Sequence, residues 1–212
     1  MNASIKKTMR AIAVAVLSGF CSTQSLASIF IRGAVWQTNH TDSELNSSFG
    51  PDLAVGGIFG TAQHHEVSVE VSKYNWEWTR PSQTAGIGWT GSGDAKSLLA
   101  SYRYYFGKPD SLIRCYLGAS VGQTKIDGDL LFNGSGVRWM GKADKTQPVF
   151  GGTVGISCNV GSHASCELGY RYSEIRGFDA TVSLFGTDLP SRQIDFPKTS
   201  AHILTAGLRV SF

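Results

Sequence analysis

Apolar and polar residues alternate with a period of two along most of the chain after residue 27. In the last twelve residues, AHILTAGLRVSF, one face of an extended strand would carry Leu204, Leu208 and Phe212, and the other Thr205 and Arg209. This period predicts β-strands, and no helical periodicity competes with it. Turn residues separate eight such segments, which are 28–37, 52–62, 66–78, 95–106, 112–125, 147–160, 165–175 and 201–212.

The connections between these segments alternate in length. Those after the second, fourth and sixth segments are short, namely QHH, GKPDS and GSHA, whereas the others are long and polar: 38–51, 79–94, 126–146 and 176–200. An even number of strands with short turns at one end and long loops at the other is typical of bacterial outer-membrane barrels. The predicted fold is therefore all-β, an eight-stranded antiparallel up-and-down transmembrane barrel over residues 28–212.

The third segment departs from simple alternation. Val67, Val69 and Val71 have one parity, whereas Trp76 and Trp78 have the other. A β-bulge near residues 72–73 would restore the register. Alternatively, the upper part of this strand rises beyond the bilayer.

The N-terminus carries the three-part pattern of a secretory signal peptide. Lys6, Lys7 and Arg10 precede a short apolar stretch, and small residues at Ser25 and Ala27 predict cleavage after Ala27. The apolar stretch is shorter than the roughly 20 residues of a membrane anchor. Lipidation at the nearby cysteine, residue 21, is disfavoured by the bulky phenylalanine before it.

Removal of this signal changes the charge balance. The whole chain has 19 Lys and Arg against 16 Asp and Glu, and residues 1–27 hold three of the bases and none of the acids. The mature chain would then have 16 of each, with no basic stripe. This balance argues against a nucleic-acid partner.

Alternation alone does not decide which face points inward, because a soluble lipocalin-like barrel would turn its apolar face inward. The polar face is rich in arginine and glutamate, separated by serine and glycine. Such charges need partners when buried, which favours a paired interior network over an ordinary wet surface. The predicted network consists of Arg32, Glu66, Glu70, Arg103, Arg114, Glu167, Arg171 and Arg209. An interior of eight strands filled in this way would be plugged, with no large channel.

Aromatic residues gather at the ends of the strands, as in the interfacial belts of membrane proteins. They include Tyr102, Tyr104, Phe106, Trp76, Trp78, Tyr170 and Tyr172. Signal peptide, eight alternating strands and the terminal LTAGLRVSF together resemble the small outer-membrane barrels of the opacity-protein, OmpX and OmpA-transmembrane-domain type. That resemblance implies a place in the bacterial outer membrane, among its lipids and lipopolysaccharide. It also implies that the barrel-assembly machinery reads Phe212 as an insertion signal.

Enzymes that modify lipid A occur among such barrels, so we considered Ser200, His202 and Glu174 as a nucleophile, base and orienting acid. Their order departs from that of the known deacylases, and an interfacial histidine beside a solvated glutamate is the simpler interpretation. Adjacent His64 and His65 would point to opposite faces, which predicts no metal site. We expect no cofactor.

The long loops offer the binding surface, because loops on a rigid scaffold commonly carry function. Their apolar residues either contact a host surface, a partner or lipopolysaccharide, or pack on each other as strand extensions; they are Leu130, Leu131, Phe132, Trp139, Met140, Leu184, Phe185 and Phe196. A non-enzymatic surface, adhesion or envelope-integrity protein is the leading hypothesis, and a lipid-A enzyme or a narrow solute channel the alternatives. Cys158 and Cys166 flank a tight turn and could form a disulfide, which would leave Cys115 over.

Overall fold

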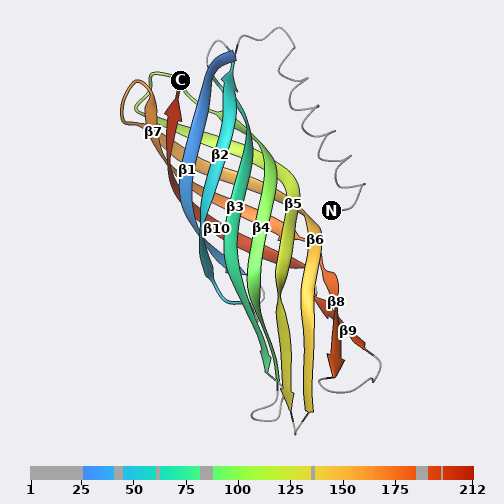
Figure 1. Ribbon diagram of the computed structural model, residues 1–212. Helices are drawn as coiled ribbons and strands as arrows, with labels where there is room; N and C mark the ends of the chain where they lie inside the picture. The colour runs from blue at the N-terminus through green and yellow to red at the C-terminus, as the bar shows by residue number, and fades with distance from the viewer. Residues whose placement is uncertain are drawn as a thin grey trace.

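Eight strands form a closed antiparallel barrel in the computed structural model, which describes residues 26–40, 45–60, 63–81, 88–134, 137–184, 191–196 and 198–212 (Figure 1). The strands are β1 (Leu26–His40), β2 (Ser48–Phe59), β3 (His65–Pro81), β4 (Gly88–Tyr105), β5 (Ile113–Gly134), β6 (Val137–Asn159), β7 (Ala164–Ile175) and β10 (Thr199–Ser211). Two further strands, β8 (Phe178–Leu184) and β9 (Arg192–Phe196), lie between β7 and β10 in the chain. The predicted eight-stranded up-and-down barrel is confirmed. No helix in these ranges is long and apolar enough to cross a membrane.

The barrel closes where the first strand meets the last. β1 and β10 pair continuously from Phe30 and Ser211 to His40 and Ala201. The final residue takes part, because the Phe212 amide donates to the carbonyl of the residue opposite, at 2.8 Å. A closed ladder leaves no exposed strand edge, which is what a hydrocarbon environment requires.

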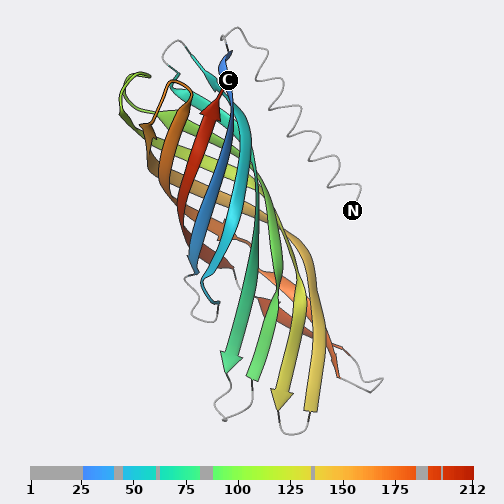
Figure 2. The same ribbon diagram turned by 60° about the vertical axis from the view of Figure 1, so that its left-hand side comes forward.

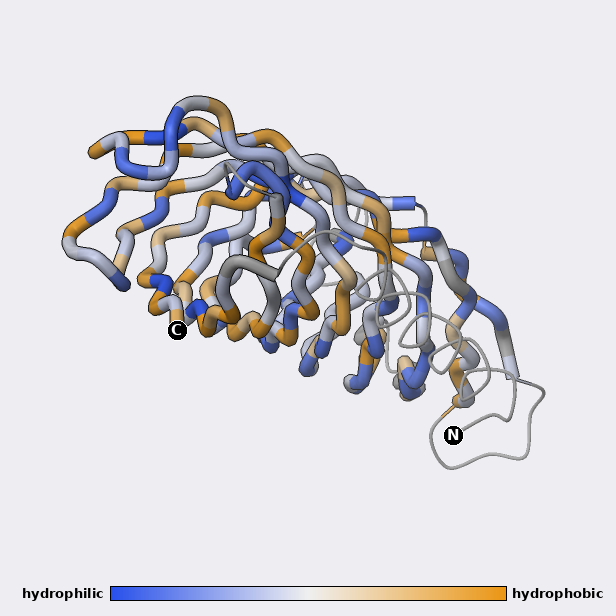
Figure 3. The backbone as a smooth tube through the Cα atoms, turned by 90° about the horizontal axis from the view of Figure 1, so that it is seen from above, coloured by the Kyte–Doolittle hydropathy of each residue, from blue (hydrophilic) through white to orange (hydrophobic). Residues whose placement is uncertain are grey.

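The outer surface near the short turns is apolar. Its exposed side chains include Ile31, Val55, Val69, Leu117, Val121, Val154, Leu168, Leu204 and Leu208. Figure 3 shows hydrophobic and hydrophilic residues alternating along the strands. Tyr102, Tyr170 and Tyr172 also point outward, with 37–42% of their surface exposed. Apolar outside and polar inside is the arrangement of a membrane barrel, the reverse of a lipocalin.

Further from the short turns this polarity inverts. On β3, Val71 points outward, but the next outward positions are the polar Lys73, Asn75 and Glu77. Trp76 and Trp78 point inward and are only 6% and 3% exposed. β3 pairs with β4 without a register shift, so the expected bulge near residues 72–73 is wrong. The two tryptophans also do not belong to an outer aromatic belt. The alternative, a strand that rises beyond the apolar band, accounts for both observations.

Four neighbouring strands, β3 to β6, extend well beyond the other strands of the barrel (Figures 1 and 2). The expected long loops 79–94 and 126–146 are therefore largely wrong: β5 and β6 pair as far as Gly134 and Val137. Few outward positions of these segments are apolar, Met140 among them, because the inverted pattern puts most of their apolar residues inside. β8 pairs with the extended part of β6, and β9 pairs with β8.

The extended strands enclose an apolar core of their own. Its buried members are Trp76, Trp78, Ala95, Leu99, Ile126, Leu130, Ala143, Val149, Ile175, Ala180 and Val182. The ring of Phe196, at the end of β9, lies 4.8 Å from the ring of Trp78 on β3. The side chains of β9 therefore contact those of β3 across the extended part of the sheet. Leu45 forms an isolated bridge to Trp78 on the same side. We call β8, β9 and the extended parts of β3 to β6 the extension.

Burial explains why the extension is ordered. Each large apolar side chain removed from water contributes about 1.5–3 kcal/mol. Of the apolar residues expected in loops, Leu130 is 1% exposed, Trp139 and Phe196 pack on the core, and Met140 remains 48% exposed. Phe185 lies outside the described residues. Leu130, Trp139 and Phe196 therefore pack together as strand extensions, whereas Met140 stays at the surface.

Candidate functional site

A layer of paired charges fills the barrel in the part ringed by the apolar band. Arg32 on β1 donates to Glu66 at 3.0 Å and to Glu70 at 2.6 Å, both on β3. Arg171 on β7 also donates to Glu70. Arg103 on β4 donates to Glu167 Oε2 on β7 at 2.8 Å. All of these side chains are no more than 6% exposed.

The last strand completes the layer. Arg209 on β10 donates from Nη1 to Glu66 Oε2 at 3.1 Å, and the same nitrogen lies 3.3 Å from Glu167 Oε1. The Tyr105 hydroxyl lies between these acids, donating to Glu66 at 2.8 Å and contacting Glu167 at 3.1 Å. We call this set of four arginines, three glutamates and Tyr105 the charge layer. It joins β1, β3, β4, β7 and β10 across the lumen.

Seven of the eight predicted interior charges lie in the charge layer, and the eighth, Arg114, lies next to it towards the short-turn end, over the ring of Tyr105. Sequence reasoning missed Tyr105, Tyr116 and Asp52, which are buried in the same interior. Tyr105 has the same parity as Arg103, so alternation alone was enough to place it inside.

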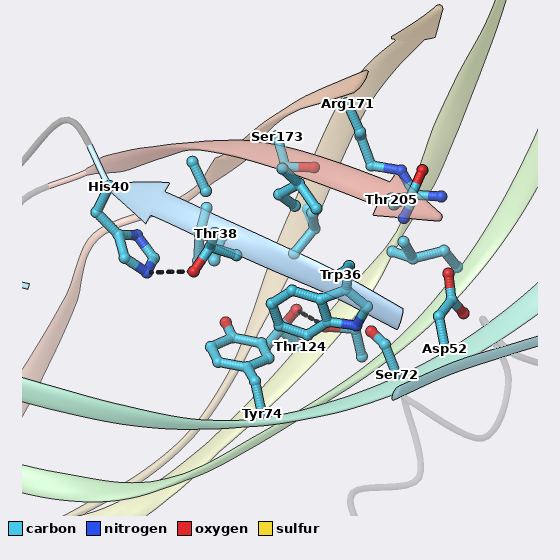
Figure 4. Close-up of a pocket in the computed structure, with 16 residues that line it drawn as sticks. Trp36, Thr38, His40, Asp52, Ser72, Tyr74, Thr124, Arg171, Ser173 and Thr205 are labelled. Atoms are coloured by element: carbon cyan, nitrogen blue, oxygen red, sulfur yellow. Dashed lines mark hydrogen bonds between the residues drawn. The ribbon is translucent and has the colours of Figure 1, made fainter. Parts of the chain in front are cut away.

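Above the charge layer the interior becomes less polar and holds two small cavities. The first, of about 40 Å³, has Arg171 and Asp52 at one end and His40 and Thr38 at the other (Figure 4). The second, of about 60 Å³, lies within the extension and is lined mainly by apolar and aromatic residues, including Trp76. Burial raises the pKa of Tyr74, which lines both cavities, well above its ordinary value. Neither cavity approaches the roughly 150 Å³ that holds a benzene molecule.

The considered catalytic residues lie together on the outer surface of β7 and β10, but each contacts another partner. Ser200 is the cross-strand partner of Glu174, and His202 that of Tyr172. Ser200 Oγ bonds to the Tyr172 hydroxyl at 2.8 Å, and His202 Nδ1 to the Tyr170 hydroxyl at 2.5 Å. Glu174 pairs with Lys198 at 2.7 Å. An acid held by a lysine is poorly placed to orient a histidine.

The three cysteines of the barrel are free thiols, so the expected disulfide between Cys158 and Cys166 is wrong. The two are direct cross-strand partners on β6 and β7. Opposite residues of a regular antiparallel ladder commonly hold their Cβ atoms about 4.5–5.5 Å apart, beyond the roughly 3.8 Å that a disulfide prefers. Cys115 lies on the same outer surface.

The adjacent histidines serve the turn before β3. His64 Nδ1 lies 2.6 Å from the Tyr105 carbonyl, and His65 Nδ1 lies 2.8 Å from the Tyr102 hydroxyl. Across the described ranges, no three His, Cys, Asp or Glu residues are grouped to hold a metal ion.

Solved structures with a similar architecture include surface and outer-membrane proteins of bacteria. Neisserial surface protein A is 17% identical, with 87% of this chain and 97% of that chain covered and a TM-score of 0.51. OprG from Pseudomonas aeruginosa is 15% identical, with 89% and 97% covered and a TM-score of 0.58. A major outer membrane protein from Thermus thermophilus is 10% identical, with 87% and 99% covered and a TM-score of 0.58. At these identities the likeness shows the fold alone.

Comparison with curated protein sequences gives no match. The outer membrane protein beta-barrel domain family matches residues 12–212, which is nearly the whole chain. With the closed barrel, its apolar outer band and its polar interior, this match places the protein in the bacterial outer membrane, in contact with its lipids. The chain belongs to the outer membrane protein beta-barrel domain family.

Proposed function

We propose that the protein is a non-enzymatic surface protein that binds a partner outside the cell through its extension. The observation that carries this proposal is the extension itself, a folded sheet with an apolar core that rises beyond the apolar band. A rigid platform loses little conformational entropy on binding, which favours recognition.

The outer face of the extension resembles the surface of a soluble protein. Lys73 pairs with Asp94 at 3.1 Å, and Lys125 lies 3.5 Å from Asp144, all with at least 43% of the side chain exposed. Positive and negative charges are mixed on this face. Binding would therefore depend on shape and on local contacts around Met140 more than on a net electrostatic field. The partner is an external macromolecule or lipopolysaccharide.

The charge layer supports a role other than solute transport. Its arginines and glutamates span the lumen with contacts of 2.6–3.1 Å, and opening a water path would leave buried charges unpaired. We also propose that the mature chain begins at Ser28 after removal of residues 1–27, and that the assembly machinery recognises β10 with Phe212. Residues 1–25 lie outside the described ranges.

A trimmed barrel tests the proposed function. Residues 127–144 would be replaced by Asn-Gly, which joins the β5 and β6 partners Ile126 and Lys145 by a two-residue turn. Adherence of bacteria displaying each form to cultured epithelial cells is the measurement, with surface level and folding checked first. We expect adherence to fall to the level of cells without the protein.

A charge reversal at Lys108, in a short turn at the opposite end, is the matched control and should adhere like the wild type. Full adherence by the trimmed barrel, at equal surface level, would refute the extension as the binding element.

A second candidate, binding of a small apolar solute, has one observation in its favour. The 60 Å³ cavity is lined by Trp76, whose buried indole nitrogen has no hydrogen-bond partner. Because the cavity is too small for an aromatic ring, ethanol is the probe: a saturable change in Trp fluorescence would detect such binding, and no saturable change would exclude it.

A further inference from the structure

The barrel has a second, polar opening at the end where the short turns lie. It forms a vestibule of about 480 Å³ lined by Gln63, Asp110, Arg114, His163, Ser165 and Arg209, among others. In outer-membrane barrels this end faces the periplasm. The vestibule is separated from the extension by the charge layer, so it is independent of the proposed surface function.

One arginine in this vestibule has no acidic partner. The described interior holds five buried arginines against four buried acids, Asp52, Glu66, Glu70 and Glu167. Arg114 is the arginine left over: it is 5% exposed and makes no ion pair within the ranges that the structure describes. Its guanidinium donates to the Gln63 carbonyl at 2.9 Å and lies 5.0 Å above the Tyr105 ring. Burying a cation without a counter-charge costs free energy, and a bound anion would offset that cost.

Several unused donors surround Arg114. Ser157, its direct cross-strand partner on β6, is 1% exposed, and its hydroxyl has no hydrogen-bond partner in the part of the chain that the structure describes. Ser165, which lines the vestibule, is 2% exposed and is likewise unpartnered. It is the cross-strand partner of Arg209, and the Nε atoms of Arg114 and Arg209 are both unpartnered. Arg114, Ser165 and Arg209 line the vestibule, and Ser157 lies opposite Arg114 on the neighbouring strand; together their N–H and hydroxyl groups match an oxyanion with several acceptor oxygens.

We propose that Arg114, Ser157, Ser165 and Arg209 form a periplasmic binding site for a phosphate group. The group would belong either to free inorganic phosphate or to the headgroup of an inner-leaflet phospholipid. The acidic side chain at the same mouth is that of Asp110, which is exposed. Among the residues that the structure describes, it forms no ion pair with Arg114, so the guanidinium remains available to an external anion.

Arginine side-chain NMR tests this site directly. The mature chain would be folded in maltoside micelles, which carry no phosphate, and sodium phosphate would replace sodium chloride at constant ionic strength. We expect the Nε–H signals of Arg114 and Arg209 to shift saturably. The same shift with chloride alone would overturn the proposal, and so would the absence of a saturable shift both with phosphate and with the phospholipid headgroup used in the second titration.

Variants separate the site from general charge effects. Arg114→Gln should abolish the shift of the Arg209 signal, whereas Arg176→Gln, at an exposed arginine at the other end of β7, should leave it unchanged. Ser165→Ala should weaken phosphate binding about tenfold, because it removes one hydrogen bond to a charged group, and it serves where Arg114→Gln does not fold. A full response in a folded Arg114→Gln barrel, or unchanged affinity in Ser165→Ala, would contradict the assignment.

A second titration distinguishes the two sources of phosphate. Dihexanoyl phosphatidylglycerol replaces inorganic phosphate at the same concentrations. A response to the lipid alone assigns the site to a membrane headgroup, and a response to both assigns it to free phosphate as well. No saturable shift of the arginine Nε–H signals with either probe would refute the site.

Discussion

At the scale of single residues, the interior depends on charges that share partners. Glu70 accepts from Arg32 and Arg171 and lies 3.6 Å from Arg103, so one carboxylate balances arginines from three strands. Removal of one member of a buried pair costs more than the pair contributes, because the partner charge is left behind.

Glu70→Gln is therefore expected to lower the free energy of unfolding by about 3–5 kcal/mol. Urea titration of the detergent-folded barrel, followed by tryptophan fluorescence, measures this loss. Glu77→Gln is the matched control: Glu77 lies on the same strand but is exposed and bonds only to Asn46 among the residues described, so it should change stability by less than about 0.5 kcal/mol. Equal effects of the two substitutions would show that the charge layer does not stabilise the fold.

At the scale of elements, the hairpin of β8 and β9 carries a pair of like charges. Asp179 and Asp195 are cross-strand partners. A hydrogen bond from the protonated Asp195 carboxyl to Asp179 and the repulsion between the two carboxylates raise the pKa of Asp195 above its ordinary value. The paired hairpin thus holds a proton more tightly than the separated strands do. Its stability is greatest below the ordinary pKa and falls as the pH rises through the raised value.

We expect the backbone amides of β8 and β9 to be better protected from hydrogen exchange at pH 4 than at pH 7, after correction for intrinsic rates. Asp195→Asn should keep the hairpin protected at both pH values, because it removes the repulsion without removing the hydrogen bond. Protection that does not vary with pH in the wild type would contradict this explanation.

The change of polarity along each strand locates the membrane boundary. On β5 the outward residues Leu117 and Val121 are apolar, whereas Lys125 and Asp127 are charged. Spin labels at residues 117 and 121 should be relaxed by oxygen, which partitions into lipid, and labels at 125 and 127 by a water-soluble nickel complex. Oxygen-dominated relaxation at residue 127 would place the extension inside the bilayer.

Alternation in the sequence predicted the eight strands and the inward parity of Arg32, Glu66 and their counterparts, because a period of two is a local property. It did not predict the extension, since inverted polarity there resembles a polar loop. It also could not pair Glu70 with Arg171, which lie 101 positions apart and meet only through the register of the closed barrel. The free thiols of Cys158 and Cys166 likewise depend on ladder geometry that spacing does not reveal.

At the scale of the whole molecule, closure should make the barrel resistant to detergent. The mature chain folded in detergent is expected to run at a different gel mobility when unboiled than when boiled, because the closed hydrogen-bonded ring resists dodecyl sulfate. Cold and boiled samples on one gel test this. A chain that is soluble without detergent and shows no shift would mean that the apolar face lines an internal pocket.

The position of Arg209 in the final strand has a consequence for the order of assembly. Glu66 and Glu167 come from β3 and β7, and both need the arginine that only β10 delivers. Until β10 pairs with β1, these two acids lack one of their cations. Burying them away from water in the incomplete barrel is then more costly than it is in the closed one. A chain cut before Arg209 would therefore leave Glu66 and Glu167 inside the barrel with one cation fewer to neutralise them.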